Sequence, residues 1–290
     1  MIAWIDTLIQ GVLLGGFFAL SGLGLSLSFG IMRIVNIAHG DFLVVAAYLC
    51  LVICGLFGLN PLLAIIIVIP LMFLFGYLLQ KTILNKGVDG GELSPLLITF
   101  GLSIILHNLL QELFSADAKS LDVGAFEVAS LNIGSLHIGW LPITILVTAL
   151  VVYGILHQIM ESTKFGMVVR ATVDDPETTS LMGVDTKKIN CLGMGLSMTI
   201  VGIAGTLFGI KSSFFPLAGG LQLLFAFEAV IIGGMGSIWG TLLGGMSLGI
   251  AQTIGYRIGS GWGEFAGHLV FFLFLLLKPS GLLSKEIQNA

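Results

Sequence analysis

The sequence has 290 residues, of which 56% are hydrophobic and only 10% are charged. Its 12 Lys and Arg and 16 Asp and Glu are too few to cover a soluble protein, in which about 25% of residues are charged. The composition therefore predicts a polytopic membrane protein, and the net charge of −4 gives no indication of a nucleic-acid partner. Three cysteines also exclude a disulfide framework.

The apolar segments predict the helices, because a membrane-spanning helix needs about 20 apolar residues. A last apolar stretch, Leu223–Leu277, holds two or three further segments and is broken at Gly233–Gly240 and Gly255–Gly263. We predict an all-α polytopic helical bundle of about eight to ten hydrophobic segments, some of them broken or re-entrant. The other candidate spans, in chain order, are Leu8–Phe29, Phe42–Phe57, Leu62–Leu84, Leu96–Phe114, Leu141–Met160 and Ile189–Ile210.

The positions of Lys and Arg predict the orientation, because cytoplasmic loops are enriched in both. Residues 161–188 carry four of them, which predicts a cytoplasmic segment, and Lys81 and Lys86 fall on the same side. Residues 115–140 have one Lys against three acidic residues and are predicted to be an extracytoplasmic loop. Arg257 fits this topology poorly.

The extracytoplasmic loop contains a predicted hairpin. Leu131-Asn132-Ile133 and Leu136-His137-Ile138 alternate apolar and polar residues, and Gly134-Ser135 between them suits a two-residue turn. This hairpin is either a plain lid over the bundle or a docking surface for an external partner.

The chain has no motif that would supply energy or catalysis. No nucleotide-binding P-loop occurs, and no Gly is followed by Lys. No complete set of metal ligands is visible, so we expect no enzyme, no metal and no cofactor in this chain. Transport energy must therefore come from an ion gradient or from another polypeptide.

Ionisable and amide side chains inside apolar segments are costly and are functional candidates by default. The candidates are Glu228 and the group Asn36, His39 and Asp41; His107 and His268 are more simply polar groups satisfied by a neighbouring helix. No Lys or Arg lies in the spans, and no intramembrane charge pairs are expected. Glu228 needs either a partner or a wet cavity.

Within residues 161–188 the sequence predicts one short helix. Asp175 is a good N-cap, Pro176 fits the first position, Glu177 favours the positive end of the helix dipole, and Gly183 suits the C-terminal cap. The helix presents a small apolar face made of Leu181, Met182 and Val184. It is either an ordinary interfacial helix or a helix that sits in a groove of another protein. The absence of an internal energy source favours the second interpretation.

Regularly spaced glycines predict tightly packed helices. They recur at intervals of four at Gly11 and Gly15, at Gly205 and Gly209, at Gly236, Gly240 and Gly244, and at Gly245 and Gly249. The denser cluster of Gly233, Gly234 and Gly236 could instead be a hinge or an unwound segment beside a pathway.

Three of these stretches together resemble the transmembrane subunit of a bacterial ABC importer of the branched-chain amino acid (Liv-type) permease family. Residues 31–41, which contain Asn36-Ile37-Ala38-His39-Gly40-Asp41, are similar to its N-[FI]-A-H-G-[DE] signature. Residues 165–171 followed by 181–184 resemble its cytoplasmic coupling segment. Residues 229–240 with Gly244-Gly245 resemble its glycine-rich region, and residues 279–283 its usual ending. The departures are Thr178, Thr179 and Ser180 where alanines are common, and Trp239 where a proline is common.

The resemblance implies one transmembrane permease domain over residues 1–290, in the bacterial inner membrane. Two cytoplasmic ATPase subunits would hold ATP and Mg²⁺, a second homologous permease chain would complete a heterodimer, and a periplasmic binding protein would deliver a branched-chain or other hydrophobic amino acid. Urea, short amides or aromatic acids are alternative substrates. The implied ATPase-coupling residues are Arg170, Asp174, Asp175, Pro176, Glu177, Leu181, Met182 and Gly183. The translocation-pathway candidates are Asn36, His39, Asp41, Glu228, Gly233, Gly234 and Gly236.

Two other classes of protein remain open from the residues alone. An ion-coupled secondary carrier would work without an ATPase and would show an internal repeat with interrupted helices. A membrane-embedded enzyme or scaffold could use His39 with Asp41, although the ligand set is incomplete.

Overall fold

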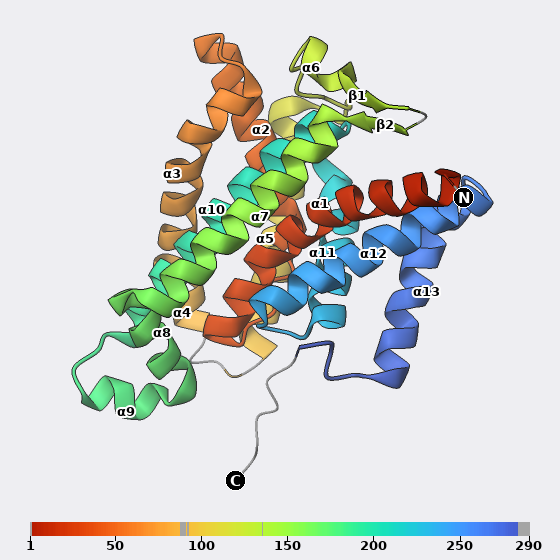
Figure 1. The fold of residues 1–290 in the computed structure, drawn as a ribbon. Coiled ribbons are helices and arrows are strands. Elements are labelled where there is room, and N and C mark those ends of the chain that lie inside the picture. Colours follow the sequence, from red (N-terminus) through yellow and green to blue (C-terminus); the bar gives the residue numbers. More distant parts are fainter. Residues whose placement is uncertain (1, 88–90, 92, 135, 284–290) are drawn as a thin grey trace.

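The computed structural model describes residues 2–87, 91, 93–134 and 136–283, and most of them are helical (Figure 1). The long helices are α1 (Ile2–Met32), α2 (His39–Phe57), α3 (Pro61–Leu79), α5 (Leu93–Phe114), α7 (Trp140–Ser162), α10 (Thr186–Lys211), α11 (Gly219–Gly233), α12 (Ile238–Ile258) and α13 (Trp262–Leu277). A π-helical turn, η1 (Gln80–Leu84), and α4 (Asn85–Gly87) continue α3. The shorter elements are α6 (Ala125–Val128), β1 (Ser130–Ile133), β2 (Leu136–Gly139), α8 (Lys164–Asp174), α9 (Pro176–Leu181) and η3 (Pro216–Ala218).

The all-α polytopic fold is confirmed. Among the described residues, seven helices are long and apolar enough to cross a membrane. The predicted stretch 223–277 resolves into α11, α12 and the shorter apolar α13, and its two breaks fall at the predicted glycines.

Helix α1 forms the centre of the bundle. It is the most buried of the candidate spans and packs against α7, α10, α11 and α12. At 1.5 Å per residue its 31 residues extend about 46 Å, which exceeds the roughly 30 Å of the hydrocarbon core. It is therefore longer than a perpendicular crossing needs, and Figure 1 shows it running beside α12.

The contact between α1 and α12 depends on small residues. A Cβ on Gly249 would lie 2.3 Å from the backbone N of Gly15, and one on Gly245 would lie 2.4 Å from that of Ala19. The predicted glycine faces therefore bring two backbones into direct contact, as is common between helices in lipid.

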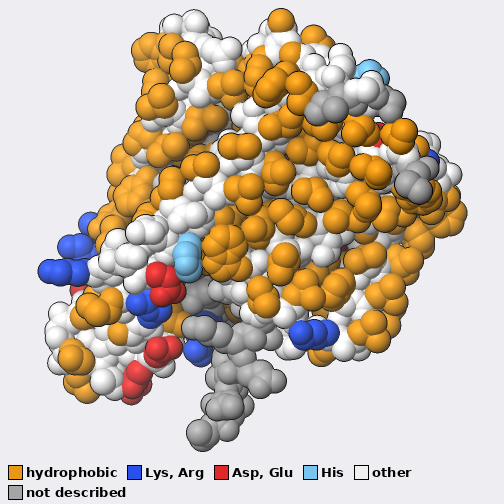
Figure 2. All heavy atoms as spheres, in the orientation of Figure 1, with side chains coloured by type: hydrophobic (Ala, Val, Ile, Leu, Met, Phe, Trp, Pro, Cys, Tyr) orange, Lys and Arg blue, Asp and Glu red, His pale blue; other side chains and the backbone are white. Residues whose placement is uncertain are grey.

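The two ends of the bundle differ in character. Hydrophobic side chains cover most of the face shown in Figure 2, while most of the charged side chains visible there lie at the lower end, where α8 and α9 project. The opposite end carries α6 and the antiparallel hairpin, in which Leu131 pairs with Ile138 and Asn132 with His137. The predicted hairpin is thus confirmed, although Ser135 of its turn lies outside the described residues.

The glycine cluster forms the turn between α11 and α12. Gly234 and Gly236 have φ values of +102° and +81°, which suit glycine. A Cβ on Gly236 would lie 3.2 Å from Cα of Gly30 in α1. The amides of Leu282 and Leu283 donate to the carbonyls of Ile232 and Gly233 at 2.8 and 3.0 Å. Chain reversal and close packing thus account for this density of glycine, while a pathway role stays a prediction.

Arg257 lies where the C-terminal end of α12 meets the start of α1. Its guanidinium donates to the carbonyl of Ala3 and to Oγ1 of Thr7, and it lies 4.6 Å from the ring centre of Trp4. These contacts explain how a charge that fits the predicted topology poorly is accommodated at this end of the bundle.

Candidate functional site

The segment α8–α9 is built by local capping. The Thr163 hydroxyl accepts from the amide of Gly166 and begins α8. Oδ1 of Asp175 accepts from the amides of Glu177 and Thr178 at 3.1 and 3.0 Å, and Pro176 takes the first position of α9. The hydroxyl and amide of Thr178 lower the pKa of the Asp175 carboxyl. The predicted short helix is therefore confirmed, with Gly183 at φ +88° behind it.

The tip of this segment is exposed and apolar. Leu181 is 88% exposed and Met182 is 81% exposed, so neither side chain is covered by the rest of the described chain. Asp174 and Glu177 are also exposed beside them. Two uncovered apolar side chains in an acidic setting are suited to a groove of a partner protein.

Side-chain hydrogen bonds fix α9 to α8 and α8 to α7. Thr179 is buried and its hydroxyl donates to the carbonyl of Ala171 at 2.9 Å. The half-buried guanidinium of Arg170 donates to the carbonyl of Met160 and lies 3.7 Å from the Glu161 carboxylate. The Thr178-Thr179 departure from the family pattern thus has a structural role, since Thr178 supports the cap and Thr179 joins the two short helices. Arg170 lies at the base of the segment, away from its exposed tip.

Arg33 connects this segment to the signature. It follows α1 with φ +53°, and its Nη2 donates to the carbonyl of Val173 near the end of α8 at 3.4 Å. This contact joins the end of α8 to the start of residues 31–41. No functional role of Arg33 was predicted from the sequence.

The signature itself is a junction of four helices. Oδ1 of Asn36 accepts from the amide of Ala38 at 3.0 Å, and the ring Nε2 of His39 donates to the carbonyl of Ser21 in α1 at 2.9 Å. The amide of Ile37 donates to Oγ1 of Thr99 in α5 at 3.2 Å. Asn36 and His39 are buried, and Nδ2 of Asn36 and Nδ1 of His39 have no hydrogen-bond partner among the described residues.

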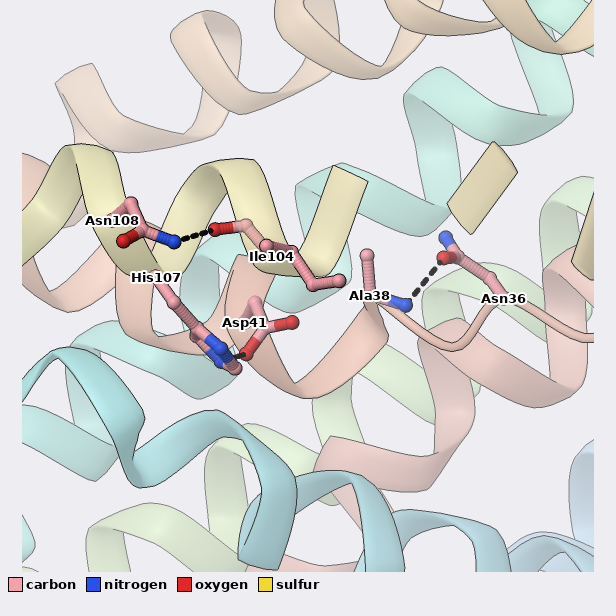
Figure 3. A network of polar contacts seen from close by, with 6 residues as sticks. All are labelled: Asn36, Ala38, Asp41, Ile104, His107 and Asn108. Atoms are coloured by element: carbon pink, nitrogen blue, oxygen red, sulfur yellow. Dashed lines mark hydrogen bonds and ion pairs between the residues drawn. The ribbon is translucent and has the colours of Figure 1, made fainter. Parts of the chain in front are cut away.

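Asp41 extends the junction to α5 and α11. Its Oδ1 lies 2.6 Å from Nε2 of His107, and the carboxyl is buried while the imidazole is half-buried. Figure 3 shows the two side chains pointing toward one another. A Cβ on the preceding residue, Gly40, would lie only 1.9 Å from the carbonyl oxygen of Gly219. Glycine at this position allows the start of α2 to lie against the start of α11.

A second carboxylate–histidine pair joins α11 to α13. Oε1 of Glu228 lies 2.5 Å from Nδ1 of His268, whose ring stacks on Phe225 with centroids 5.9 Å apart. Glu228 is 1% exposed, and its Oε2 has no hydrogen-bond partner among the described residues. Glu228, which was predicted to need either a partner or a wet cavity, therefore has a partner for one of its two carboxylate oxygens.

These two pairs correct one expectation from the sequence. Asp41 with His107 and Glu228 with His268 are intramembrane pairs that were not expected. The members of each pair are far apart in the sequence, so only the tertiary arrangement brings them together. The sequence held one indication of these pairs. A carboxylate within the membrane needs a partner, and the histidines in two other apolar segments were available as partners.

The prediction that the chain contains no catalytic motif needs one correction, because residues 245–249 have the spacing of a serine-nucleophile motif, although they do not form its structure. Gly245-Met246-Ser247-Leu248-Gly249 matches G-x-S-x-G, but that motif needs a sharp strand-to-helix turn. Here it lies inside α12, where the Ser247 hydroxyl donates to the carbonyl of Leu243 at 2.8 Å.

Comparisons with known proteins agree on the family. Residues 7–277 match the family model described as the permease component of the branched-chain amino acid transport system. The chain is 27% identical to the high-affinity branched-chain amino acid transport system permease protein BraD of Pseudomonas aeruginosa, covering 99% of this chain and 98% of that protein. It is 28% identical to the probable branched-chain amino acid transport permease protein LivH of Methanocaldococcus jannaschii, covering 93% and 90%.

A third relative is the permease protein LivH of Escherichia coli K12, which is 25% identical over 99% of this chain and 97% of its own length. No solved structure gives a significant match. The matched region contains the signature, the α8–α9 segment and the glycine-rich turn. The chain therefore belongs to the branched-chain amino acid transport permease family and is a multi-pass protein of the inner membrane.

Proposed function

We propose that the chain is the transmembrane subunit of an ATP-driven ABC importer for branched-chain or other hydrophobic amino acids. The proposal rests on one observation: α9 is a capped helix whose tip leaves the apolar side chains of Leu181 and Met182 exposed, where a partner could bind them. Because the chain has no P-loop, ATP and Mg²⁺ would bind to two separate cytoplasmic ATPase subunits that dock on this tip.

The proposal assigns a side of the membrane to each end of the bundle. Residues 161–188 lie in the cytoplasm, where Lys and Arg are retained, and residues 115–140 lie outside. The hairpin β1–β2 would then face a periplasmic binding protein. Residues 1–290 would act as one permease domain beside a second, homologous permease chain.

The substrate class rests on the relatives. Three relatives that the chain matches over nearly its whole length have names that refer to branched-chain amino acids. Selection among substrates would be shared with the binding protein, so urea, short amides and aromatic acids remain alternatives for this importer.

The contacts around α8 support a mechanical route for coupling. Movement of α9 by the ATPases would reach α8 through Thr179, α7 through Arg170 and the signature through Arg33. The bundle would then switch between outward and inward openings. Asn36, His39, Asp41 and Glu228 are buried in the described conformation, and the pathway would open beside them and beside Gly233, Gly234 and Gly236.

The test uses one exposed residue at each end of the bundle. Leu181→Asp places a charge on the α9 tip, and Val128→Asp, at the hairpin end where Val128 is 84% exposed, is the matched control for co-purification of the ATPases. We expect Leu181→Asp to abolish co-purification of the ATPases and ATP-dependent uptake, with the amount of folded permease unchanged. Normal co-purification with Leu181→Asp would contradict the docking assignment.

One observation favours a second candidate function. The two buried carboxylate–histidine pairs are the kind of group that a proton-coupled secondary carrier uses. Uptake of leucine into vesicles that lack ATP, driven by an imposed proton gradient and abolished by a protonophore, would support that carrier. Uptake that requires ATP and survives the protonophore would support the importer.

A further inference from the structure

A cavity of about 530 Å³ lies where the end of α3, the π-helical turn and the start of α10 meet. Four lysines line it: Lys81 lies in the π-helical turn η1, Lys86 in α4, and Lys187 and Lys188 at the start of α10. The cavity shares no lining residue with the α9 tip or with either carboxylate–histidine pair, although Lys187 and Lys188 lie at the end of the cytoplasmic segment 161–188.

The described lining of the cavity is positively charged even when Lys187 is left out of the count. Lys81, Lys86 and Lys188 accompany one carboxylate among these lining residues, that of Asp185. Its Oδ1 already accepts from the amide of Lys188 at 3.0 Å as the N-cap of α10. The positive end of the 26-residue α10 adds to the potential. The ligand that fits this cavity is therefore an anion with several acceptor oxygens.

Hydrogen bonds hold the two walls of the cavity together. Nδ2 of Asn85 donates to the carbonyl of Lys187 at 3.4 Å and to Sγ of Cys191 at 3.3 Å. Oδ1 of Asn85 accepts from Nε2 of the buried Gln80 at 2.9 Å. The backbone segments that bear the lysines of the two walls are thus held together by Asn85, as expected for a preformed binding site.

An exposed apolar stripe leads to the cavity along α3. Leu71, Leu74 and Leu78 lie three and four residues apart on one face, and each is exposed. The next turn carries Lys81, and Tyr77 lines the cavity beside it. The cavity therefore lies where a hydrophobic span reaches the membrane surface.

We propose that this cavity binds a phosphate group, and that the apolar stripe favours the phosphate of an anionic phospholipid whose acyl chains lie along α3. Basic pockets between transmembrane helices at the membrane surface recognise lipid headgroups in this way. The same lysines would also accept a free phosphate, since the shared chemistry is a phosphate oxygen near ammonium groups.

The proposal is tested by native mass spectrometry of the full-length chain in mild detergent. Dioleoyl phosphatidylglycerol, dioleoyl phosphatidylcholine and inorganic phosphate are titrated separately. We expect one phosphatidylglycerol to bind with preference over phosphatidylcholine, and Lys81→Gln with Lys188→Gln to weaken that binding about 30-fold. Phosphate bound as tightly as phosphatidylglycerol, and lost in the same variant, would identify the free ion as the source and would contradict the lipid assignment.

A matched control removes the same charge elsewhere. Lys164→Gln with Lys278→Gln changes two exposed lysines outside the cavity, so it should leave the phosphatidylglycerol affinity within about twofold of wild type. Equal weakening in both double variants, or unchanged binding in the cavity variant, would overturn the proposal. Thermal unfolding of all three proteins checks that the variants remain folded.

Discussion

The α8–α9 segment and the signature junction carry two of the motifs that resemble the family, yet they are built in opposite ways. The tip of α9 projects from the bundle with Leu181 and Met182 uncovered. The junction at residues 36–41 buries nearly every polar group that it contains and joins α1, α2, α5 and α11. We therefore expect substitutions at the exposed tip to leave the fold intact, and substitutions at the buried junction to disrupt it.

The largest loss of stability is expected from a substitution that breaks the signature junction. Gly40→Ala would place a Cβ 1.9 Å from the Gly219 carbonyl oxygen, and backbone on both sides cannot give way. We expect a loss of about 3 kcal/mol or more of stability and little folded protein on size-exclusion chromatography. Gly55→Ala in the same helix has no atom within 4 Å of its Cβ and should behave as wild type. A normal yield of folded Gly40→Ala would disprove the close approach of α2 and α11.

The next largest loss of stability is expected when one member of a buried carboxylate–histidine pair is removed. His268→Ala leaves the Glu228 carboxyl, 1% exposed, without a partner on either oxygen. Such a loss costs about 3 kcal/mol, measured as a lower midpoint of thermal unfolding. Adding Glu228→Gln should recover part of the loss, because the buried charge is removed.

His137→Ala serves as the control for the pair. His137 is exposed on the hairpin, and its imidazole Nδ1 lies 2.6 Å from Oδ1 of Asn132, so the loss of this side-chain contact should cost about 1 kcal/mol or less. Equal effects at the two histidines would show that the Glu228–His268 contact adds little to stability.

The smallest effect concerns the α9 cap. Asp175→Ala should speed hydrogen exchange at the amides of Glu177 and Thr178, which lose their acceptor, while Asp175→Asn keeps an acceptor. The overall unfolding midpoint should not move, because this segment is outside the bundle. If hydrogen exchange rose as much in the rest of the bundle as in α9, the stability of α9 would not be independent of the bundle.

The same cap has a defined pH dependence. Hydrogen bonds from Thr178 lower the folded-state pKa of Asp175 below its unfolded value of about 3.9. The contribution of the charged cap is therefore complete above that unfolded value and is lost as the pH falls through the lower folded-state pKa. Exchange at the two amides should stay constant from pH 7 to pH 5, after correction for the intrinsic rate.

Local patterns predicted what local interactions determine. The apolar segments, the hairpin between residues 131 and 138 and the cap at Asp175 all depend on residues close together in the sequence, and the structure has them as predicted. The pairs Asp41–His107 and Glu228–His268 were missed because they depend on which helices are neighbours. The glycines at 233–236 were ambiguous for the same reason, since their close contact with Gly30 follows from tertiary packing.

The bonds from Leu282 and Leu283 to the end of α11 have a consequence for biosynthesis. During translation α11 enters the membrane well before these two residues have been made, so the carbonyls of Ile232 and Gly233 must wait for α12 and α13 to insert. A message truncated after α13 would still encode every hydrophobic helix of the described chain. Its product would insert and yet leave that helix end open to quality-control proteases.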